Sequence, residues 1–235
     1  MAFSFKQFHV EDTHCGMKIS TDGVLLGAWT RTPPPSAHIL DVGAGSGLIA
    51  LMLAQRCPSA HITALELDLN AVTDLSSNIQ SSPWADRIEA VQGDFQTFTP
   101  QEDILYDLIV SNPPFFDTGI VSPDTSRAGA RHRAGLDYRS LIAHAHNLLS
   151  ADGSLAMIVP AECESDLVLH AELARLNVSR LCHVITRPGK SAKRLLVQLD
   201  RHPGHCSDSR LTIRDVHDQW TPEYIALTKD FYLNF

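Results

Sequence analysis

A glycine-rich turn has the clearest chemical character in this sequence. Asp41 precedes three alternating glycines, Gly43, Gly45 and Gly47, where an apolar segment gives way to a helix-forming one. Glycines at such a turn allow a tight change of direction and let a ligand approach the backbone closely. The spacing differs from the G-x-G-x-x-G pattern of dinucleotide-binding proteins, and no Lys-Ser or Lys-Thr pair follows, as a P-loop would need. The turn therefore favours, as its ligand, a nucleoside with an amino-acid tail over a dinucleotide or nucleotide bound through its pyrophosphate.

Two acidic residues follow later apolar segments and extend this site. Glu66 lies about 20 residues beyond the turn, a spacing at which a carboxylate accepts hydrogen bonds from ribose hydroxyls. Asp94 can accept a hydrogen bond from an adenine amino group, and Phe95 beside it can cover the ring. Each acid could also be a solvated residue at the end of a strand, but their spacing from the glycine turn favours the nucleoside. Together these residues predict a site for S-adenosylmethionine.

The segment Asn112-Pro113-Pro114-Phe115 could activate a nitrogen that accepts a methyl group. The amino group of adenine is a poor nucleophile because its lone pair is delocalised into the ring. The side-chain oxygen of Asn112 and the carbonyl of Pro113 could each accept one N–H and turn the lone pair towards a sulfonium methyl. The prolines fix this turn, and Phe115 could stack on the base. A simple turn that ends a strand is the alternative; we expect Asn112, Pro113 and Phe115 to be catalytic, and Asn112 also to contact the cofactor.

Basic residues are unevenly distributed in a chain whose formal net charge is −8. No Lys or Arg occurs from residue 88 to residue 126, and two basic groups follow. An acidic protein is a poor candidate for bulk nucleic-acid binding, and basic groups often form only a solvated face. The alternative is a local surface for the phosphates of an RNA substrate. The residues expected on that surface are Arg127, Arg131, Arg133, Lys190, Lys193 and Arg194.

Alternating strand-like and helix-like segments must position these residues. Such repeated β-α units predict a mostly parallel sheet with helices on both faces, which binds ligands beyond the carboxyl ends of its strands. Seven strands are expected, at residues 38–43, 61–67, 88–94, 106–111, 153–160, 181–186 and 195–200. Helices are expected at residues 21–29, 46–57, 69–80, 138–149, 162–175 and 222–232.

The remaining segments lie at the two ends of the chain. We expect a single domain over residues 1–235, with an N-terminal extension (1–35) and a C-terminal tail (205–235) packed on it. Pro33, Pro34 and Pro35 form a stiff link between the extension and the sheet.

Composition restricts the class of protein. Apolar residues make up 44% of the chain and charged residues 20%, as in ordinary globular domains. No signal peptide and no membrane-spanning segment is evident. The 5 cysteines and 12 histidines form no cluster with the spacing of a metal site, so we expect no metal. A cytoplasmic location is expected; the sequence does not determine the oligomeric state, and a monomer is slightly favoured.

The motifs ILDVGAGSG, ALELD, GDF and NPPF together resemble those of class I amino-methyltransferases, which have a Rossmann-like, seven-stranded α/β fold. The segments FKQF, MKISTDGVLLGAW and LTKDFYLNF are similar to the ends of bacterial valine-tRNA adenine-N6 methyltransferases. This resemblance covers nearly the whole chain, and the N-terminal TDGVLLGAW stretch distinguishes this family from other NPPF enzymes.

The resemblance implies a target and several further site residues. The target would be the N6 amino group of the adenosine at tRNA position 37, next to the anticodon. Lys18, Thr21 and Asp22 would lie near the methionine end of the cofactor, although Thr21 could equally cap a helix. Phe8 could cover the cofactor or belong to the core, and the segment 116–133 would be a loop over the target base.

Other functions remain alternatives at this point. NPPF also occurs in enzymes that methylate glutamine in release factors, guanine in ribosomal RNA and adenine in DNA. A protein glutamine methyltransferase would hold a planar amide with the same acceptors, but it usually has an added N-terminal helical domain. An NAD-dependent dehydrogenase would share the sheet but not the glycine spacing. A non-catalytic S-adenosylmethionine-binding module would have no use for an amine-acceptor pair.

Overall fold

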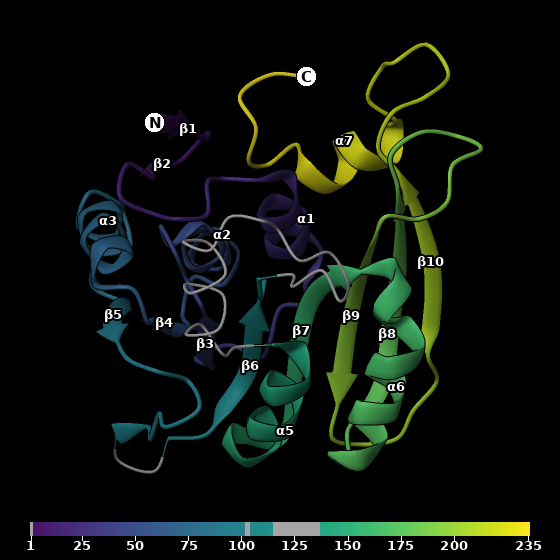
Figure 1. Ribbon diagram of the computed structural model, residues 1–235. Helices are drawn as coiled ribbons and strands as arrows, with labels where there is room; N and C mark the ends of the chain where they lie inside the picture. Colours follow the sequence, from purple (N-terminus) through teal and green to yellow (C-terminus); the bar gives the residue numbers. More distant parts are fainter. Residues whose placement is uncertain (1, 102–103, 115–136) are drawn as a thin grey trace, which may run out of the picture.

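A computed structural model describes residues 2–101, 104–114 and 137–235. In these residues eight strands form one sheet in the order β10-β8-β9-β7-β6-β3-β4-β5 (Figure 1). Strand β9 is antiparallel to both of its neighbours, and the other neighbouring pairs are parallel. The strands are β3 (His38–Val42), β4 (His61–Glu66), β5 (Ile88–Gln92), β6 (Tyr106–Ser111), β7 (Leu149–Pro160), β8 (Asn177–Ile185), β9 (Arg194–Asp200) and β10 (Ser207–Thr212).

The eighth strand corrects the expectation of seven. Strand β10 pairs in parallel with β8 at the edge of the sheet, inside the segment that was expected to be a tail. Its burial pattern is exposed except near its end, where Leu211 is buried. It therefore lacks the apolar alternation by which a strand is recognised in sequence. Polar and charged side chains on an edge strand are a common protection against pairing with other chains.

Helices cover both faces of the sheet over two separate apolar cores. Along β6, Leu108 and Val110 belong to one core and Ile109 to the other, as expected for alternating side chains of a fully covered strand. The first core is covered by four helices and the second by two. The four are α1 (Thr21–Trp29), α2 (Leu48–Arg56), α3 (Leu69–Gln80) and α7 (Pro222–Thr228), and the two are α5 (Tyr138–Leu148) and α6 (Glu164–Leu173).

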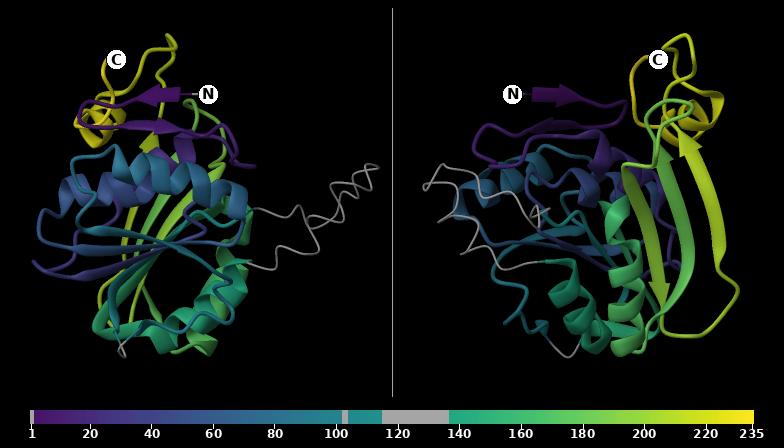
Figure 2. Two further views of the ribbon diagram at one scale, coloured as in Figure 1. Left: turned by 90° about the vertical axis from the view of Figure 1, so that its left-hand side faces the viewer. Right: turned by 45° about the vertical axis from the view of Figure 1, so that its right-hand side comes forward.

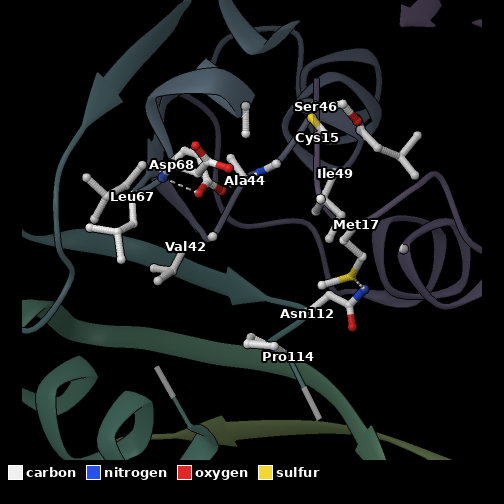
Figure 3. A pocket seen from close by; sticks show the side chains of 18 of the residues that line it. Cys15, Met17, Val42, Ala44, Ser46, Ile49, Leu67, Asp68, Asn112 and Pro114 are labelled. Atoms are coloured by element: carbon white, nitrogen blue, oxygen red, sulfur yellow. Dashed lines mark hydrogen bonds between the residues drawn. The ribbon is translucent and has the colours of Figure 1, made fainter. Parts of the chain in front are cut away.

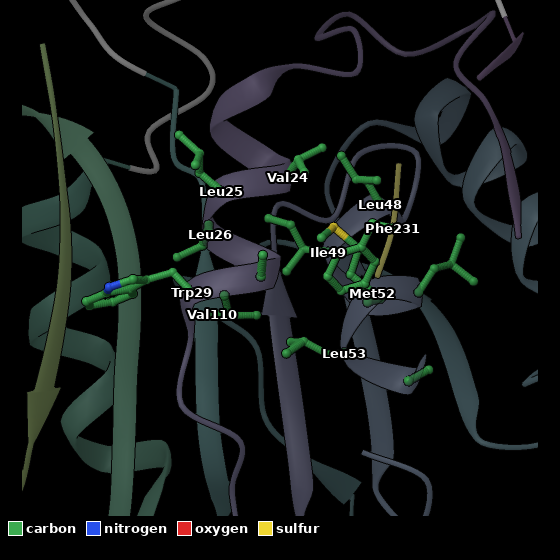
Figure 4. Close-up of a cluster of buried hydrophobic side chains, with 14 of the residues drawn as sticks. Val24, Leu25, Leu26, Trp29, Leu48, Ile49, Met52, Leu53, Val110 and Phe231 are labelled. Carbon is green, nitrogen blue, oxygen red and sulfur yellow. The ribbon is translucent and has the colours of Figure 1, made fainter. Parts of the chain in front are cut away.

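Close packing of α1 against α2 brings the N-terminal extension onto the sheet (Figure 4). A Cβ atom at Gly27 would lie 2.7 Å from the sulfur of Met52, so glycine is needed at this contact. Buried side chains on both helices, among them Leu25, Leu26 and Leu53, fill the same core. The beginning of α1 is thereby fixed at the carboxyl edge of the sheet, where Asp22 pairs with Arg194 at 2.7 Å.

The two ends of the chain lie near each other (Figure 2). The N-terminal hairpin consists of β1 (Ala2–Ser4) and β2 (His9–Glu11). The backbone N–H of Lys6 donates to Phe231, and its ammonium group donates to the carbonyl of Lys229. Phe8 is buried and stacks on Phe5 with ring centroids 4.6 Å apart. Both terminal segments therefore pack on the helices that cover the first core.

Element boundaries differ from expectation by a few residues. Helix α2 begins at Leu48 because Gly47 has a left-handed φ of 84°. Helix α6 ends at Leu173 and is preceded by a 3-10 turn, η2 (Ala161–Cys163), and α7 ends at Thr228 instead of residue 232. Helices α1 and α3 have the expected bounds, and Asp68 caps α3 as expected. In the described residues, no helix has the length and apolar character needed to cross a membrane.

Candidate active site

A cavity of about 300 Å³ lies at the carboxyl ends of β3, β4, β5 and β6 (Figure 3). We call it the strand-end cavity. Its walls are the loops that follow these four strands and the N-terminal segment 15–20. Seven of the expected site residues line it: Lys18, Gly43, Gly45, Glu66, Asp94, Phe95 and Asn112. Pro114 of the NPPF turn lines it as well. The position agrees with the general rule for ligands of open α/β sheets.

The glycine turn is held open by backbone conformations that other residues rarely adopt. Gly43, Gly45 and Gly47 have φ values of 70°, 55° and 84°. A Cβ atom at Gly47 would also come within 2.7 Å of Leu75, so this residue allows α3 to pack behind the turn. The N–H groups of Gly43 and Ala44 both donate to the carbonyl of Leu65. The turn is thus tied to β4, and Gly47 itself lies behind the cavity wall.

Glu66 connects the glycine turn to the beginning of α3. Its Oε2 accepts a hydrogen bond from the N–H of Gly45 at 2.8 Å, and its Oε1 accepts one from the N–H of Asp68 at 2.8 Å. An ionised carboxylate has about four acceptor positions, so each oxygen keeps capacity for a ligand hydroxyl. The two backbone bonds fix the orientation of the carboxylate, which is what bidentate recognition of a ribose requires.

Asp94 and Phe95 form the wall contributed by the loop after β5. Asp94 accepts a hydrogen bond from the N–H of Gln96, which fixes its side chain in a turn. Phe95 is only 4% exposed, belongs to the second core and lies edge-on to His144. It therefore offers a rigid apolar surface to the cavity.

Within the described part of the chain, Asn112 contributes a buried, unsatisfied oxygen to the site. Its Oδ1 is buried and has no hydrogen-bond partner among the described residues, while its Nδ2 lies 4.0 Å from the sulfur of Met17. The residue before it, Ser111, is fully buried and donates to the carbonyl of Val42 at 2.7 Å, which joins the end of β6 to that of β3. Pro113 is buried and does not line the cavity. Phe115 lies outside the described residues.

Asp41 lies behind the cavity rather than in its wall. It is fully buried, and its Oδ2 accepts a hydrogen bond from the N–H of Ala50 in the first turns of α2. Burial raises the pKa of Asp41 to about 7; the bond from Ala50 opposes this effect, and the charge of Glu66 adds to it. Asp41 therefore positions the glycine turn against α2.

Residues of α3 that sequence reasoning missed hold the N-terminal wall. Asp74 accepts hydrogen bonds from the backbone N–H groups of His14 and Cys15 and from the His14 ring. Asn78 bonds to both backbone groups of Glu11 and to the carbonyl of Ser46. Both side chains are buried on the face of α3 that carries Leu75. We call Asp74 and Asn78 the α3 clamp. Their presence four residues apart on the apolar face of an amphipathic helix is the signal by which the sequence could have revealed it.

Opposing effects act on the titratable groups of this clamp. Burial disfavours the charged form of Asp74, but hydrogen bonds from His14 and Cys15 outweigh it and lower the pKa of Asp74. Burial, reinforced by the hydrogen bond to Asp74, raises the pKa of the Cys15 thiol to about 12. Cys15 thus lines the cavity as an uncharged thiol.

Thr21 lies outside the strand-end cavity, whereas Lys18 lies in its wall. Ser20, not Thr21, accepts the capping hydrogen bond at the beginning of α1. Thr21 is exposed and lines a second cavity beside the first, and Lys18 lines both. The Lys18 ammonium group donates to the carbonyl of Asp12 and lies 3.8 Å from the carboxylate of that residue.

The expected phosphate-binding residues are only partly described. Arg127, Arg131 and Arg133 lie outside the described residues. Lys190 and Lys193 are exposed in the loop between β8 and β9 (residues 186–193), which we call the basic loop. Arg194 is half-buried, and its guanidinium pairs with Asp22, so it helps to fix the beginning of α1.

Comparison with known proteins gives a consistent family. Residues 22–181 match the family model of the methyltransferase small domain. The chain is 42% identical over 233 residues to the tRNA1(Val) (adenine(37)-N6)-methyltransferase of Tolumonas auensis, covering 99% of this chain and 97% of that protein. It is 44% identical over 232 residues to a protein of the same name from Bacteroides fragilis, covering 98% and 97%.

A solved structure agrees on the fold. The crystal structure of a predicted O-methyltransferase from Agrobacterium tumefaciens superposes with a TM-score of 0.71 at 18% identity, covering 89% of this chain and 96% of that one. Relatives of 42–44% identity match the chain nearly end to end, so the chain belongs to the tRNA1(Val) (adenine(37)-N6)-methyltransferase family, whose methyl donor is S-adenosylmethionine.

Proposed function

We propose that this protein transfers a methyl group from S-adenosylmethionine to the N6 amino group of the adenine at position 37 of valine tRNA. The names of the relatives support the substrate. The observation that carries the chemistry is the buried Oδ1 of Asn112, which has no donor among the described residues and belongs to a residue in the cavity wall. A substrate amino group would supply the missing donor.

The residues of the strand-end cavity fit S-adenosylmethionine. Glu66 presents two oriented acceptors for the ribose hydroxyls, and Asp94 offers a carboxylate for the adenine amino group. Phe95 and Leu65 give apolar walls for the ring. The bound cofactor supplies a sulfonium-linked methyl group, which is an electrophile.

Asn112 and Pro113 prepare the nitrogen that receives this methyl group. The Asn112 oxygen and the Pro113 carbonyl each accept one N–H of the adenine amino group, which withdraws the lone pair from the ring and directs it. The bound cofactor would supply the methyl group, and the methylated nitrogen would release one proton to water. The hydrogen bond from Ser111 to Val42 keeps this turn next to the glycine turn. Stacking of the base on Phe115 stays a prediction.

Phosphate contacts are proposed for the basic residues that carry no ion pair in the described structure. Lys190 and Lys193 are exposed on the basic loop and available to an RNA backbone. Arg127, Arg131 and Arg133 are proposed for the same role on sequence grounds. Arg194 contributes indirectly, because its pairing with Asp22 holds α1 in place.

One experiment tests this function directly. The purified protein is incubated with labelled S-adenosylmethionine and RNA from a bacterial strain that lacks the enzyme, and the RNA is digested to nucleosides. We expect label in N6-methyladenosine, and in valine tRNA when single species are isolated. Label in N2-methylguanosine, or in glutamine when release factors replace the RNA, would instead assign the site to the guanine or glutamine enzymes. If no methyl group is transferred to any of these acceptors, the protein is a non-catalytic S-adenosylmethionine-binding module.

A further inference from the structure

A second cavity, of about 360 Å³, lies next to the strand-end cavity and has aromatic walls. We call it the aromatic cavity. Lys18, Ile19 and Ser20 line both cavities and form the partition between them. The rings that line the aromatic cavity come from both ends of the chain: Phe3, Trp220, Tyr224, Tyr232 and Phe235.

The rings form a connected surface whose outer members are open to solvent. Trp220 stacks on Tyr224 with centroids 4.8 Å apart, and Tyr232 lies 5.8 Å from Phe235 in an edge-on arrangement. Phe3 and Phe235 remain 40% and 45% exposed. Exposed aromatic rings at the rim of a cavity indicate a surface that becomes covered by a ligand.

The charges in this cavity favour a neutral ligand. Among the described lining residues, Asp12 and Lys18 have the only charged side chains, and they pair with each other. The carboxylate of Asp12 also accepts a hydrogen bond from the N–H of Ile19, which holds the partition. A phosphate would find no net positive charge here, whereas a neutral flat ring would find stacking partners and the polar groups of Ser20, Thr21 and Asn234.

The wall that carries Trp220 is continuous with the basic loop. Arg214 lies over the Trp220 ring, with its Cζ 3.6 Å from the centroid, and its N–H donates to the carbonyl of Thr186. Arg187 of the basic loop pairs with Asp218 at 2.8 Å, and Arg214 contacts the same carboxylate. The basic loop, which carries Lys190 and Lys193, therefore adjoins the wall of the aromatic cavity.

We propose that the aromatic cavity binds a second unpaired base of the RNA substrate, next to the base that is methylated. The target base needs the acceptors of the NPPF turn, from which Asn112 lines the strand-end cavity, so the aromatic cavity is left for a neighbour. Proteins that bind single-stranded RNA stack successive bases on aromatic side chains and track the backbone with basic residues. This inference rests on the proposed function and adds a second base to the recognised surface.

The test pairs a protein variant with an altered RNA. The RNA is the anticodon stem-loop of the methylated tRNA, in which the nucleotides on either side of the target adenosine are replaced one at a time by abasic nucleotides. With wild-type protein, one of these replacements should raise Kd about tenfold, as expected for one lost stacking contact. Phe235→Ala should raise Kd for the intact RNA by a similar factor and should abolish the penalty of that abasic replacement.

Three controls make the result specific. Phe235→Tyr keeps a ring and should restore both the affinity and the abasic penalty. Leu173→Ala removes an exposed apolar side chain on α6, which contributes no residue to the aromatic cavity. This variant should change neither the affinity for the intact RNA nor the abasic penalty. Phe3→Ala tests the opposite wall in case the Phe235 variant folds poorly, which thermal unfolding and S-adenosylmethionine binding would reveal.

The inference is overturned if wild type and Phe235→Ala show the same abasic penalties at every position. Competition for the cavity by free nucleosides, with no effect of the RNA changes, would likewise assign the cavity to a small ligand and overturn it. Both outcomes are distinct from a failure of the proposed function, in which wild-type protein would form no N6-methyladenosine.

Discussion

A buried acceptor without a donor costs roughly 1–3 kcal/mol of folding free energy. Asn112 Oδ1 is such an atom among the described residues, and the surrounding backbone is fixed by Ser111 and two prolines. The cost is understandable at a site where the donor arrives with the substrate. An interaction that strengthens as the amine becomes tetrahedral stabilises the transition state more than the bound substrate.

Replacement of Asn112 should therefore affect turnover more than binding. Asn112→Ala is expected to lower kcat by about 10²–10³, as for loss of one preorganised partner at a reacting centre. S-adenosylmethionine affinity, measured by calorimetry, should stay close to wild type because Glu66 and Asp94 are intact. Asn147→Ala, at an exposed position on α5, is the matched control. Near wild-type single-turnover rates in the Asn112 variant would place the acceptor elsewhere.

The buried acid of the glycine turn should make stability depend on pH. Asp41 has a pKa of about 7 in the folded protein, against roughly 3.9 for an aspartate in an unfolded chain. Between these values the folded protein keeps a proton that the unfolded chain releases, so the contribution of Asp41 to stability falls as pH rises from about 4 through 7. The Asp41→Asn variant lacks this effect.

Urea unfolding of both proteins at pH 5 and pH 8 measures the difference. The stability of wild type minus that of Asp41→Asn should be larger at pH 5 than at pH 8, by more than ~1 kcal/mol. All other titrating groups are common to the two proteins and cancel in this comparison. An equal difference at the two pH values would mean that Asp41 is ionised in the fold throughout this range.

At the scale of elements, α3 links the N-terminal segment to the glycine turn. Asp74 and Asn78 hold the backbone at residues 11, 14 and 15 and at Ser46, so one helix positions two walls of the strand-end cavity. The segment 15–20 has no regular secondary structure of its own. Its position depends on these side-chain bonds and on those of Asp12.

Loss of this clamp should weaken both stability and cofactor binding. Asp74→Ala removes the acceptor for two backbone N–H groups, which we expect to cost about 2–3 kcal/mol of unfolding free energy. S-adenosylmethionine affinity should fall as well, because the wall at residues 15–18 loses its support. Asp86→Ala, at an exposed position shortly after α3, should leave both measurements unchanged. If the variant loses stability but binds the cofactor normally, Asp74 stabilises the fold without supporting the cofactor site.

The sequence predicted the elements whose signals are local. Helix α3 has a cap at Asp68 and a clear amphipathic pattern, and β3 is an apolar run that ends at a glycine, so both were found. Strand β10 and the N-terminal hairpin were missed because exposed, polar strands lack that pattern. The role of Asp41 behind the site and the pairing of Arg194 with Asp22 depend on tertiary contacts that spacing in the sequence does not reveal.

At the scale of the molecule, a chain of net charge −8 is proposed to bind a polyanion. Such binding requires the basic groups to be concentrated, and the exposed lysines of the basic loop meet this condition. Only a few phosphate contacts are expected, so the dependence of RNA affinity on salt should be modest.

Charge reversal on the basic loop tests this arrangement. Replacing Lys190 and Lys193 by Glu should weaken RNA binding and reduce the slope of log Kd against log salt by about 1 for each lost contact. Cofactor affinity should not change. Arg210→Glu, on the exposed edge strand β10, changes the net charge as each single Lys→Glu replacement does and is a charge-reversal control outside the basic loop. RNA affinity that is insensitive to both salt and these variants would show that the lysines are only solvated.

Residues that are translated far apart in time bind each other in the fold. Lys6 donates to the carbonyl of Lys229, across 223 positions of sequence, and Phe5 packs on Tyr232. At ~5–20 residues per second, that stretch takes roughly 10–45 s to translate. During this time Phe5 lacks its contact with Tyr232, and a nascent chain exposes this surface to chaperones. In stalled chains with a linker long enough to span the exit tunnel, a chain that ends shortly before residue 229 should therefore stay bound to chaperones far longer than one that ends after residue 232.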